Sequence, residues 1–315
     1  MRSSQSLLLV ASSAVASLLL VFLTITASEP PRSPLFGFYE RAESDLQKRR
    51  LDIEILFLDW QDPNATARLI TFLKRAQQRQ RIPLITLEPH PRYEAGRGQE
   101  TLWADVMAGH HDQTINSIAT TLATSRNPIL VRFGHEMDIK GQYPWSFNDH
   151  ERYISMYRYV HTKFGGSRLS HVYWVWSPAG RPNSHLFWPG GAFVDVIGIS
   201  AYATRAWRAD RSLESFTQIL ERTRWLHRRY GRPLLIAEAG VSGSSADQQR
   251  WLSEAVKALP RFPEVCGLVY FNAPQPSWMP LATGHEDWSL QQGPLDWLMQ
   301  RLPLPARRGL SCVEA

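Results

Sequence analysis

The sequence predicts an α/β fold, a single-domain (β/α)8 TIM barrel, from three observations. The chain has 315 residues, enough for one barrel of about 250 residues after an N-terminal segment. Short apolar, β-rich runs alternate with helix-like stretches along the chain. Several of these runs are continuously apolar, which is typical of parallel strands that are covered on both faces.

The predicted strands are eight, and in chain order they are 36–39, 53–60, 83–88, 129–133, 172–176, 194–200, 234–238 and 265–272. The clearest helical stripes lie at 65–79, 114–123, 153–164, 213–230 and 295–302. Eight strands favour a closed barrel over an open sheet, and no Gly-rich phosphate loop follows the first strand. We find no internal repeat and no second domain.

The N-terminus predicts export. Arg2 precedes a mostly apolar run, 7–27, which ends at the small residue Ala27 and is followed by a polar, Pro-rich linker, 28–35. This pattern is typical of a secretory signal peptide, although about 20 apolar residues also suffice for an uncleaved membrane anchor. Both alternatives place the barrel domain, 36–303, and a C-terminal tail, 304–315, in the periplasm or outside the cell, the second with a membrane tether.

Composition narrows the range of partners. The net charge is +6, but the basic residues are scattered over predicted helices such as 222–229, where we interpret them as solvated faces. We therefore expect no nucleic-acid partner. The chain has only two cysteines, Cys266 and Cys312, and the sequence leaves open whether they are free thiols or one disulfide.

Polar and aromatic residues gather where the predicted strands end. They are Asp59, Trp60, Glu88, His90, Arg132, His135, Glu136, Trp174, Trp176, Tyr202, Glu238 and Asn272. In a (β/α)8 barrel the active site lies at this C-terminal face. Carboxylates, a guanidinium, imidazoles and flat rings suit glycosidic cleavage, which needs two carboxyl groups flanking the bond and surfaces for sugar rings.

Two carboxylates stand out as a pair. Glu136 directly follows the fourth strand and Glu238 ends the seventh, on opposite sides of the barrel mouth. A lone Glu at a strand end is more often part of an ion pair, and Asp59 and Glu88 remain alternative acids. A zinc site at His135-Glu136 is not expected, because position 139, where the helical motif needs a second His, is Ile. We expect no metal and no other cofactor.

Three segments resemble glycoside hydrolase family 26. They are ILVRFGHEM at 129–137, WVWSP at 174–178 and IAEAG at 236–240, and the resemblance extends over 37–272. The family contains mainly β-mannanases and belongs to a clan of retaining (β/α)8 enzymes with catalytic glutamates on strands four and seven. The resemblance therefore implies a retaining glycosidase.

By position, the resemblance implies that Glu136 is the acid/base and Glu238 the nucleophile. The substrate-binding residues that it implies are Arg132, His135, Tyr202 and Trp145. Three further tryptophans follow strands five, six and eight: Trp176, Trp207 and Trp278. We expect Trp145, Trp176, Tyr202 and at least one of the other two to line one groove with the glutamates.

The chain departs from the family in its subsites. Asp138-Ile139 stands where the family commonly has Asn-Gly, and Ser200-Ala201-Tyr202 where it often has Asp-Gly-Tyr. We predict a monomeric retaining endo-β-glycanase acting on a mannan, a mixed-linkage glucan or an exopolysaccharide. The alternative is a non-catalytic or weakly active polysaccharide-binding barrel in exopolysaccharide export or envelope assembly. The presence of both glutamates favours the hydrolase.

Overall fold

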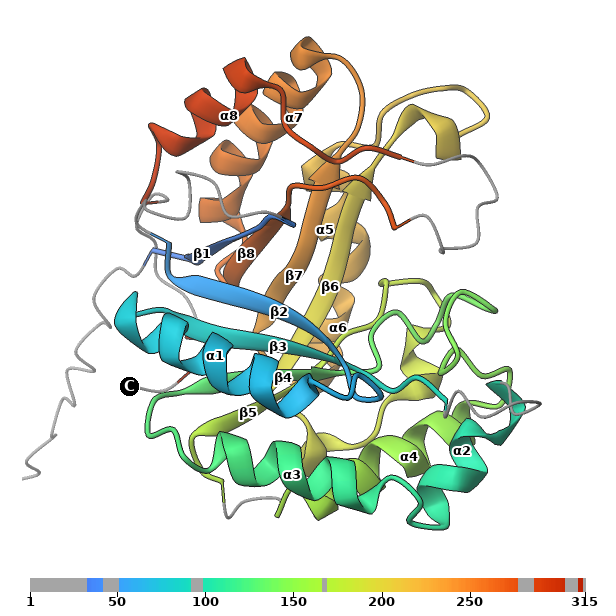
Figure 1. Ribbon diagram of the computed structural model, residues 1–315. Coiled ribbons are helices and arrows are strands. Elements are labelled where there is room, and N and C mark those ends of the chain that lie inside the picture. Colours follow the sequence, from blue (N-terminus) through green and yellow to red (C-terminus); the bar gives the residue numbers. More distant parts are fainter. Residues whose placement is uncertain are drawn as a thin grey trace, which may run out of the picture. The chain divides into compact units, whose positions relative to one another are not determined.

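The computed structural model describes residues 33–41, 51–91, 99–165, 169–276, 286–303 and 311–313, all within one compact unit, Pro31–Ala315. Eight parallel strands form a closed barrel in sequence order, and β8 pairs with β1 to close it (Figure 1). The predicted single-domain (β/α)8 barrel is confirmed.

The strands are β1 (Leu35–Tyr39), β2 (Ile53–Asp59), β3 (Ile82–Glu88), β4 (Ile129–Phe133), β5 (Val172–Trp176), β6 (Val196–Ala203), β7 (Leu234–Val241) and β8 (Val265–Phe271). The helices are α1 (Ala65–Gln78), α2 (Gln99–Met107), α3 (Asp112–Leu122), α4 (His150–Lys163), α5 (Phe216–Thr223), α6 (Trp225–Tyr230), α7 (Ser245–Ala258) and α8 (Gln292–Met299). The single helix expected at 213–230 is therefore two helices, which meet at Arg224.

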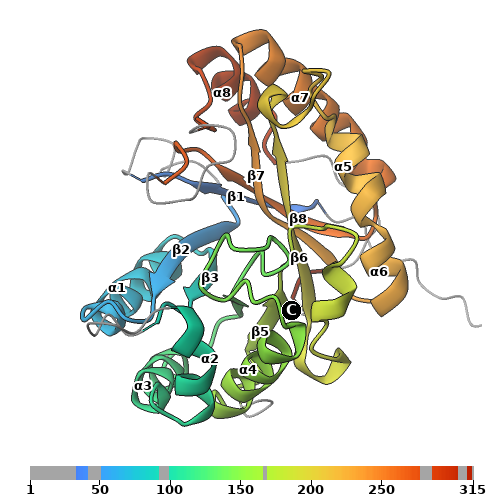
Figure 2. The ribbon, with the colours of Figure 1, turned by 90° about the vertical axis from the view of Figure 1, so that its right-hand side faces the viewer.

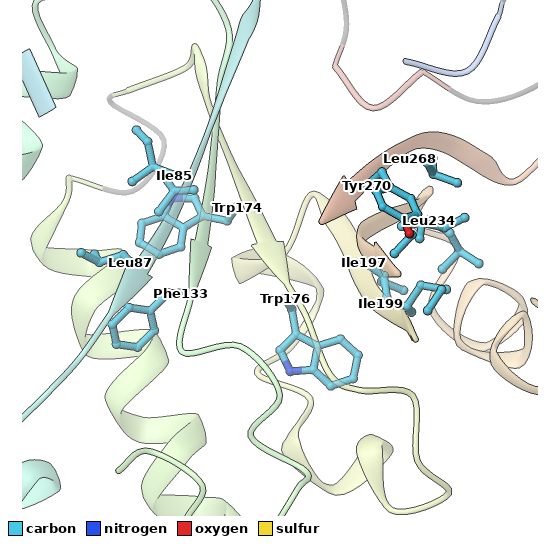
Figure 3. Close-up of a cluster of buried hydrophobic side chains, with 14 of the residues drawn as sticks. Ile85, Leu87, Phe133, Trp174, Trp176, Ile197, Ile199, Leu234, Leu268 and Tyr270 are labelled. Atoms are coloured by element: carbon cyan, nitrogen blue, oxygen red, sulfur yellow. The ribbon is translucent and has the colours of Figure 1, made fainter. Parts of the chain in front are cut away.

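Alternate strand residues form two apolar layers, as the period of a β-strand requires. The inner layer, which fills the barrel, takes residues such as Leu84, Leu130, Val175 and Leu235 and contains no helix residue. The outer layer includes Ile85, Trp174, Ile197 and Leu234 and packs against the helices (Figure 3). The interior of the barrel is thus filled, so polar side chains that point inward can reach solvent only at the two ends of the barrel.

The helices cover the outer layer with one apolar face each. On α1, Leu69, Phe72, Leu73 and Ala76 recur at helical spacing and are buried. Figure 2 shows α1, α3 and α4 outside the strands from β2 to β5, with α5, α6 and α7 outside β6 to β8. Each fully buried apolar side chain contributes roughly 1.5–3 kcal/mol, so this coat holds the strand ends in place.

The two cysteines are joined. Cys266 on β8 and Cys312 form a disulfide with their Cα atoms 5.1 Å apart, and both are buried. The bond ties residues 311–313 of the predicted tail to the barrel. Among the described residues, no helix is long and apolar enough to cross a membrane. The predicted signal or anchor segment, 7–27, lies outside the described residues.

Candidate active site

A cleft of about 1570 Å³ opens where the strands end, and three glutamates lie in it. Glu88 ends β3, Glu136 follows β4 and Glu238 lies on β7. Aromatic side chains surround them, including Tyr39, Phe57, Tyr143, Tyr202, Phe271 and Trp288. The sequence-predicted pair, Glu136 and Glu238, therefore shares one cleft.

An irregularity in the sheet aims Glu238 toward the barrel axis. Ile199 pairs with Ile236, but Ser200 pairs with Glu238, so one residue of β7 has no partner on β6. That residue, Ala237, belongs to the inner apolar layer. In a regular strand its neighbour Glu238 would point outward, whereas here Glu238 reaches Arg132 across the barrel mouth. A bulge beside a functional side chain re-aims it in this way.

Two fixed donors hold the Glu238 carboxyl group. Arg132, fully buried on β4, contacts Oε1 through Nη1 and is itself fixed by a 2.8 Å bond from Nε to Ser177 Oγ. The hydroxyl of Tyr202 donates to Oε2 at 2.5 Å. Burial, with the Glu238 charge second, raises the pKa of Tyr202 well above 10, so this hydroxyl keeps its proton. The guanidinium supplies the positive charge that balances an ionised Glu238.

The backbone turns sharply between β4 and Glu136. Gly134 has φ of +54° and Glu136 has φ of +53°, so both are left-handed. This conformation is strained for Glu and costs roughly 1–2 kcal/mol. A 2.8 Å bond from Glu136 N to Ser177 O, at the end of β5, and a 3.4 Å bond from Ser146 Oγ to Glu136 O hold it. These contacts hold the strained backbone of Glu136 in one geometry.

The Glu136 carboxyl group has neutral hydrogen-bond partners. Gln142 Nε2 and the Tyr143 hydroxyl each donate to Oε2 at 3.3 Å. Burial, and next the negative charge of Glu238, raise the pKa of Glu136 to about 7. The Ser200 hydroxyl and Arg132 act in the opposite direction. A carboxyl group with this pKa carries a proton in a large fraction of molecules at neutral pH, as a general acid must.

His135 contacts the same tyrosine from the other side. Its Nε2 lies 3.2 Å from the Tyr143 hydroxyl oxygen, and the side chain lines the cleft. Burial, and next the charge of Arg132, lower the pKa of His135 well below 6.5, so the imidazole is neutral. Its Nδ1 is buried without a hydrogen-bond partner.

Glu88 is a third carboxyl group in the cleft. Burial, and next the charges of Glu238 and Asp59, raise the pKa of Glu88 to about 8. At neutral pH it is therefore protonated. Among the residues that the structure describes, no three His, Cys, Asp or Glu side chains are grouped as metal ligands would be.

The predicted tryptophan groove needs correction at two positions. Trp145 and Trp176 have no exposed surface and do not line the cleft. Trp145 lies beneath the loop that carries Glu136. Its Nε1 donates to His135 O at 2.6 Å, and its ring stacks on that of Tyr143 with the ring centroids 4.7 Å apart. It therefore supports the cleft from below.

Trp176 is a core residue. Its neighbour Val175 fills the barrel, so Trp176, which belongs to the outer layer (Figure 3), faces outward. There it packs against Trp188 and Tyr230. Trp207, which is 49% exposed, does line the cleft beside Trp288. Trp278 lies outside the described residues. One of the predicted exposed tryptophans is thus in the cleft, and two of the predicted four groove residues are not.

Several residues of the site were not predicted. Tyr143 lines the cleft, and Ser177 is buried behind it; only their contacts with Glu136 and Arg132 reveal their roles. Arg222 and Arg229, interpreted from the sequence as solvated helix faces, line the cleft together with Trp225. The helical periodicity of this segment does not predict a position in the cleft, because it does not show which loops pack beside the helix.

Comparison with known proteins agrees with this geometry. Residues 100–229 match the model of glycosyl hydrolase family 26. Endoglucanase H of Acetivibrio thermocellus is 25% identical over 260 residues, which cover 78% of this chain and 27% of that protein. A mannan endo-1,4-beta-mannosidase of Bacillus subtilis is 27% identical over 186 residues, which cover 53% of this chain and 46% of the relative.

The chain thus spans less than half the length of either curated relative. Among solved structures, GH26C from Muricauda sp. superposes with a TM-score of 0.63 at 16% identity, covering 87% of this chain and 90% of the other, which shows the shared fold. The family match, the relatives and the paired strand-end glutamates lead to one assignment. They support glycoside hydrolase family 26.

Proposed function

We propose that the protein is a retaining endo-β-glycanase that hydrolyses a β-linked polysaccharide by double displacement. One observation carries the proposal: two glutamates share the cleft in opposite environments. Arg132 and Tyr202 hydrogen-bond to Glu238, while Glu136, with neutral partners, has a pKa raised to about 7 by burial. Retaining cleavage requires one carboxylate that attacks and one carboxylic acid that donates a proton, and the two environments suit these two roles.

In the first step, a Glu238 oxygen attacks the anomeric carbon and the bond to the leaving oxygen breaks. Glu136 gives its proton to that oxygen, so the leaving sugar departs as a neutral alcohol. The charge on Glu238 is consumed in the new ester bond. Arg132 and Tyr202 orient the attacking carboxylate without reacting themselves.

In the second step, Glu136 is a carboxylate and acts as the base. It takes a proton from water while the water oxygen attacks the anomeric carbon and the bond to Glu238 breaks. Glu238 is released as a carboxylate beside Arg132. Glu136 is again protonated, and both groups have returned to their starting states.

Cleft size and relatives support a polymeric β-glycan as substrate. A volume of about 1570 Å³ exceeds the roughly 300–1,000 Å³ of small-molecule pockets. The relatives' names specify an endoglucanase and a mannan endo-1,4-beta-mannosidase. Trp207 at the rim offers a flat surface for a sugar ring.

A polysaccharide panel tests the proposal. Mannan, mixed-linkage glucan, xylan and the exopolysaccharide of the source organism are incubated with the protein, and new reducing ends are measured. The Glu238→Ala variant is the matched control. Reducing ends that appear with the parent but not with the variant support the hydrolase, whereas binding of one glycan without cleavage of any supports the polysaccharide-binding barrel.

We further propose that the domain works outside the cytoplasmic membrane. The apolar run at 7–27 and the Cys266–Cys312 disulfide support this, because disulfides persist in oxidising compartments. Cell fractionation and sequencing of the mature N-terminus test it. An N-terminus near Ser28 indicates a cleaved signal peptide, an intact one in the membrane fraction indicates an anchor, and a cytosolic full-length protein contradicts the proposal.

A further inference from the structure

The charges that line the cleft are unevenly distributed. The described acidic residues of the lining are the three central glutamates. Away from them, the charged lining is cationic: Arg41, Lys140, Arg181, Arg222 and Arg229. Four of these come from the segments that follow β4 and β5 (Lys140 and Arg181) and from α5 and α6 (Arg222 and Arg229). We call this part of the lining the basic arm and define it as Lys140, Arg181, His185, Arg222, Trp225 and Arg229.

Three cations of the basic arm are not neutralised by the protein. The side chains of Lys140, Arg181 and Arg229 are exposed. Within the described part of the chain, none of them forms an ion pair with a carboxylate. Arg222, by contrast, pairs with Glu214 at 2.8 Å. The arm therefore presents net positive charge to whatever occupies the cleft.

The arm is fixed relative to the proposed acid. Asp138, two residues after Glu136, accepts hydrogen bonds from the backbone N of Ala179 at 2.7 Å and of Arg181 at 3.1 Å, and from Ser184 Oγ at 2.7 Å. Asp138 is buried, so these bonds are sheltered from water. The segment that carries Arg181 is thus tied to the segment that carries Glu136.

The same segment is pressed against α5. Gly180 has φ of +79°, and a Cβ there would lie 2.6 Å from Thr223 Cγ2, so only glycine allows this approach. Next to Thr223, Arg222 Nη1 donates to Gly180 O at 3.3 Å. Two segments far apart in the sequence therefore form one surface, in which the backbone that carries Arg181 is held against α5.

Aromatic rings accompany the cations. Trp225 is partly exposed in the arm, and the ring of His185 lies 6.2 Å from it. A tryptophan face suits the apolar face of a sugar, and a guanidinium suits a carboxylate, to which it can donate two parallel hydrogen bonds. Rings and cations together match a chain of sugars in which some carry carboxylates.

We propose that the basic arm forms subsites for carboxylated sugars, so that the preferred substrate is an acidic β-linked polysaccharide. This inference rests on the proposed function, because it concerns the chain that the two glutamates would cleave. A neutral mannan or glucan would leave these three cations of the cleft without a carboxylate partner among the described residues. An acidic chain would pair with them while its scissile bond lies at Glu136 and Glu238.

Binding to matched polymers tests the inference without turnover. The probes are mixed-linkage β-glucan and β-mannan oligosaccharides, each before and after oxidation of its C6 hydroxymethyl groups to carboxylates. Binding is measured with the Glu136→Gln protein, and with Glu238→Gln as a second inactive form. We expect the oxidised form to bind at least about fivefold tighter at low salt, and the ratio to fall below about twofold at ~500 mM NaCl.

Variants locate the effect. Arg181→Gln with Arg229→Gln, in the same inactive background, should bring the ratio below about twofold, chiefly by weakening the binding of the oxidised oligosaccharide, and an unchanged thermal unfolding midpoint shows that the fold is intact. Arg228→Gln is the matched control, because Arg228 neighbours Arg229 on α6 and is exposed but does not line the cleft. It should keep the full preference.

Equal binding of the neutral and oxidised probes, or no binding of either, overturns the inference. So does tighter binding of single-stranded RNA than of the oxidised probe. These failures are distinguishable from failure of the proposed function: cleavage of a neutral glycan without preference leaves the hydrolase standing and removes only the acidic substrate. Preferred binding of the oxidised probe without any cleavage supports the acidic ligand and contradicts the proposed hydrolase.

Discussion

The ends of β4 and β7 each place a glutamate in the same cleft, but the two carboxyl groups have different hydrogen-bond partners. Glu238 lies within β7 and touches a buried guanidinium and a phenol that keeps its proton. Glu136 lies beyond β4 in a left-handed conformation, and its hydrogen-bond donors, Gln142 and Tyr143, are neutral. Partners and burial, rather than residue type, therefore distinguish the two proposed roles.

The difference has an approximate size. The pKa of Glu136 rises from 4.5 to about 7, chiefly through burial and then through the Glu238 charge, which corresponds to roughly 3 kcal/mol in favour of the protonated form. Part of this shift depends on the other glutamate being ionised. The two strand ends are thus a coupled pair, and a change at one should be visible at the other.

The largest expected effect comes from removing either carboxyl group. Glu238→Ala and Glu136→Ala should each lower polysaccharide turnover by about 10⁴-fold or more. Added azide should distinguish them, because it attacks the sugar directly in Glu238→Ala and the glycosyl-enzyme in Glu136→Ala. For a β-glycoside with a good leaving group, the first variant gives an α-glycosyl azide and the second a β-glycosyl azide. The same anomer from both variants, identified by NMR, contradicts the assigned roles.

Breaking the Arg132–Glu238 pair should cost both stability and activity. Arg132→Met leaves a buried carboxylate with only Tyr202 as a hydrogen-bond partner, so unfolding in urea should show a loss of about 3–5 kcal/mol. We expect kcat to fall by about 10³-fold, since the nucleophile loses its orientation. Arg208→Met, which removes an exposed ion pair with Asp210, is the control and should change stability by less than about 1 kcal/mol. Equal losses of stability in the two variants would show that the buried ion pair contributes no more than an exposed one.

Two tyrosines allow a finer test of the comparison, because each donates a hydrogen bond to one of the two glutamates. Tyr202→Phe removes a 2.5 Å hydrogen bond to Glu238 and should lower kcat/KM by about 10–100-fold. Tyr143→Phe removes a 3.3 Å bond to Glu136 and should lower it by less than about tenfold. Steady-state kinetics on one substrate measure both, and the reverse order would contradict the geometry.

The pH dependence gives a smaller, graded effect. Because Glu136 must be protonated to act as the acid and its raised pKa is about 7, kcat/KM should fall as pH rises through 7, by about tenfold from pH 6 to pH 8. Glu88, with a pKa raised to about 8, is the competing explanation. The Glu88→Gln variant should show the same fall in kcat/KM above pH 7 and retain activity at pH 6 within about threefold. If this fall disappears in the variant, Glu88 and not Glu136 is the titrating group.

The sequence predicted the scaffold better than the surfaces. Continuous apolar runs identify buried parallel strands, and the strand-end glutamates follow from them. The predicted sixth and seventh strands ended at 200 and 238, short of the observed ends of β6 and β7 at Ala203 and Val241. The continuous apolar runs are interrupted by the polar residues Ser200 and Glu238, so the apolar pattern alone does not show that the strands continue. The disulfide, left open by the sequence, depends on where the tail returns to β8.

The tryptophans mark the limit of such prediction. Trp145 follows β4 and Trp176 ends β5, as groove residues would, yet Trp145 supports a loop and Trp176 packs on the outside of the barrel. Strand periodicity distinguishes the inner and outer layers, but loop contacts decide what lies at the rim. The basic arm was likewise hidden, since Arg181 and Arg229 meet at one cleft only in the folded chain.

The most direct test of the central claim is to trap the intermediate on Glu238. The Glu136→Ala variant is mixed with an aryl β-glycoside whose leaving group needs no proton, then digested and analysed by mass spectrometry. The account predicts rapid release of about one equivalent of the phenol, followed by a stall, with one glycosyl mass on the peptide that contains Glu238. An adduct on another residue, or phenol release without any adduct, would contradict the assignment of Glu238 as nucleophile and Glu136 as the base that completes the cycle.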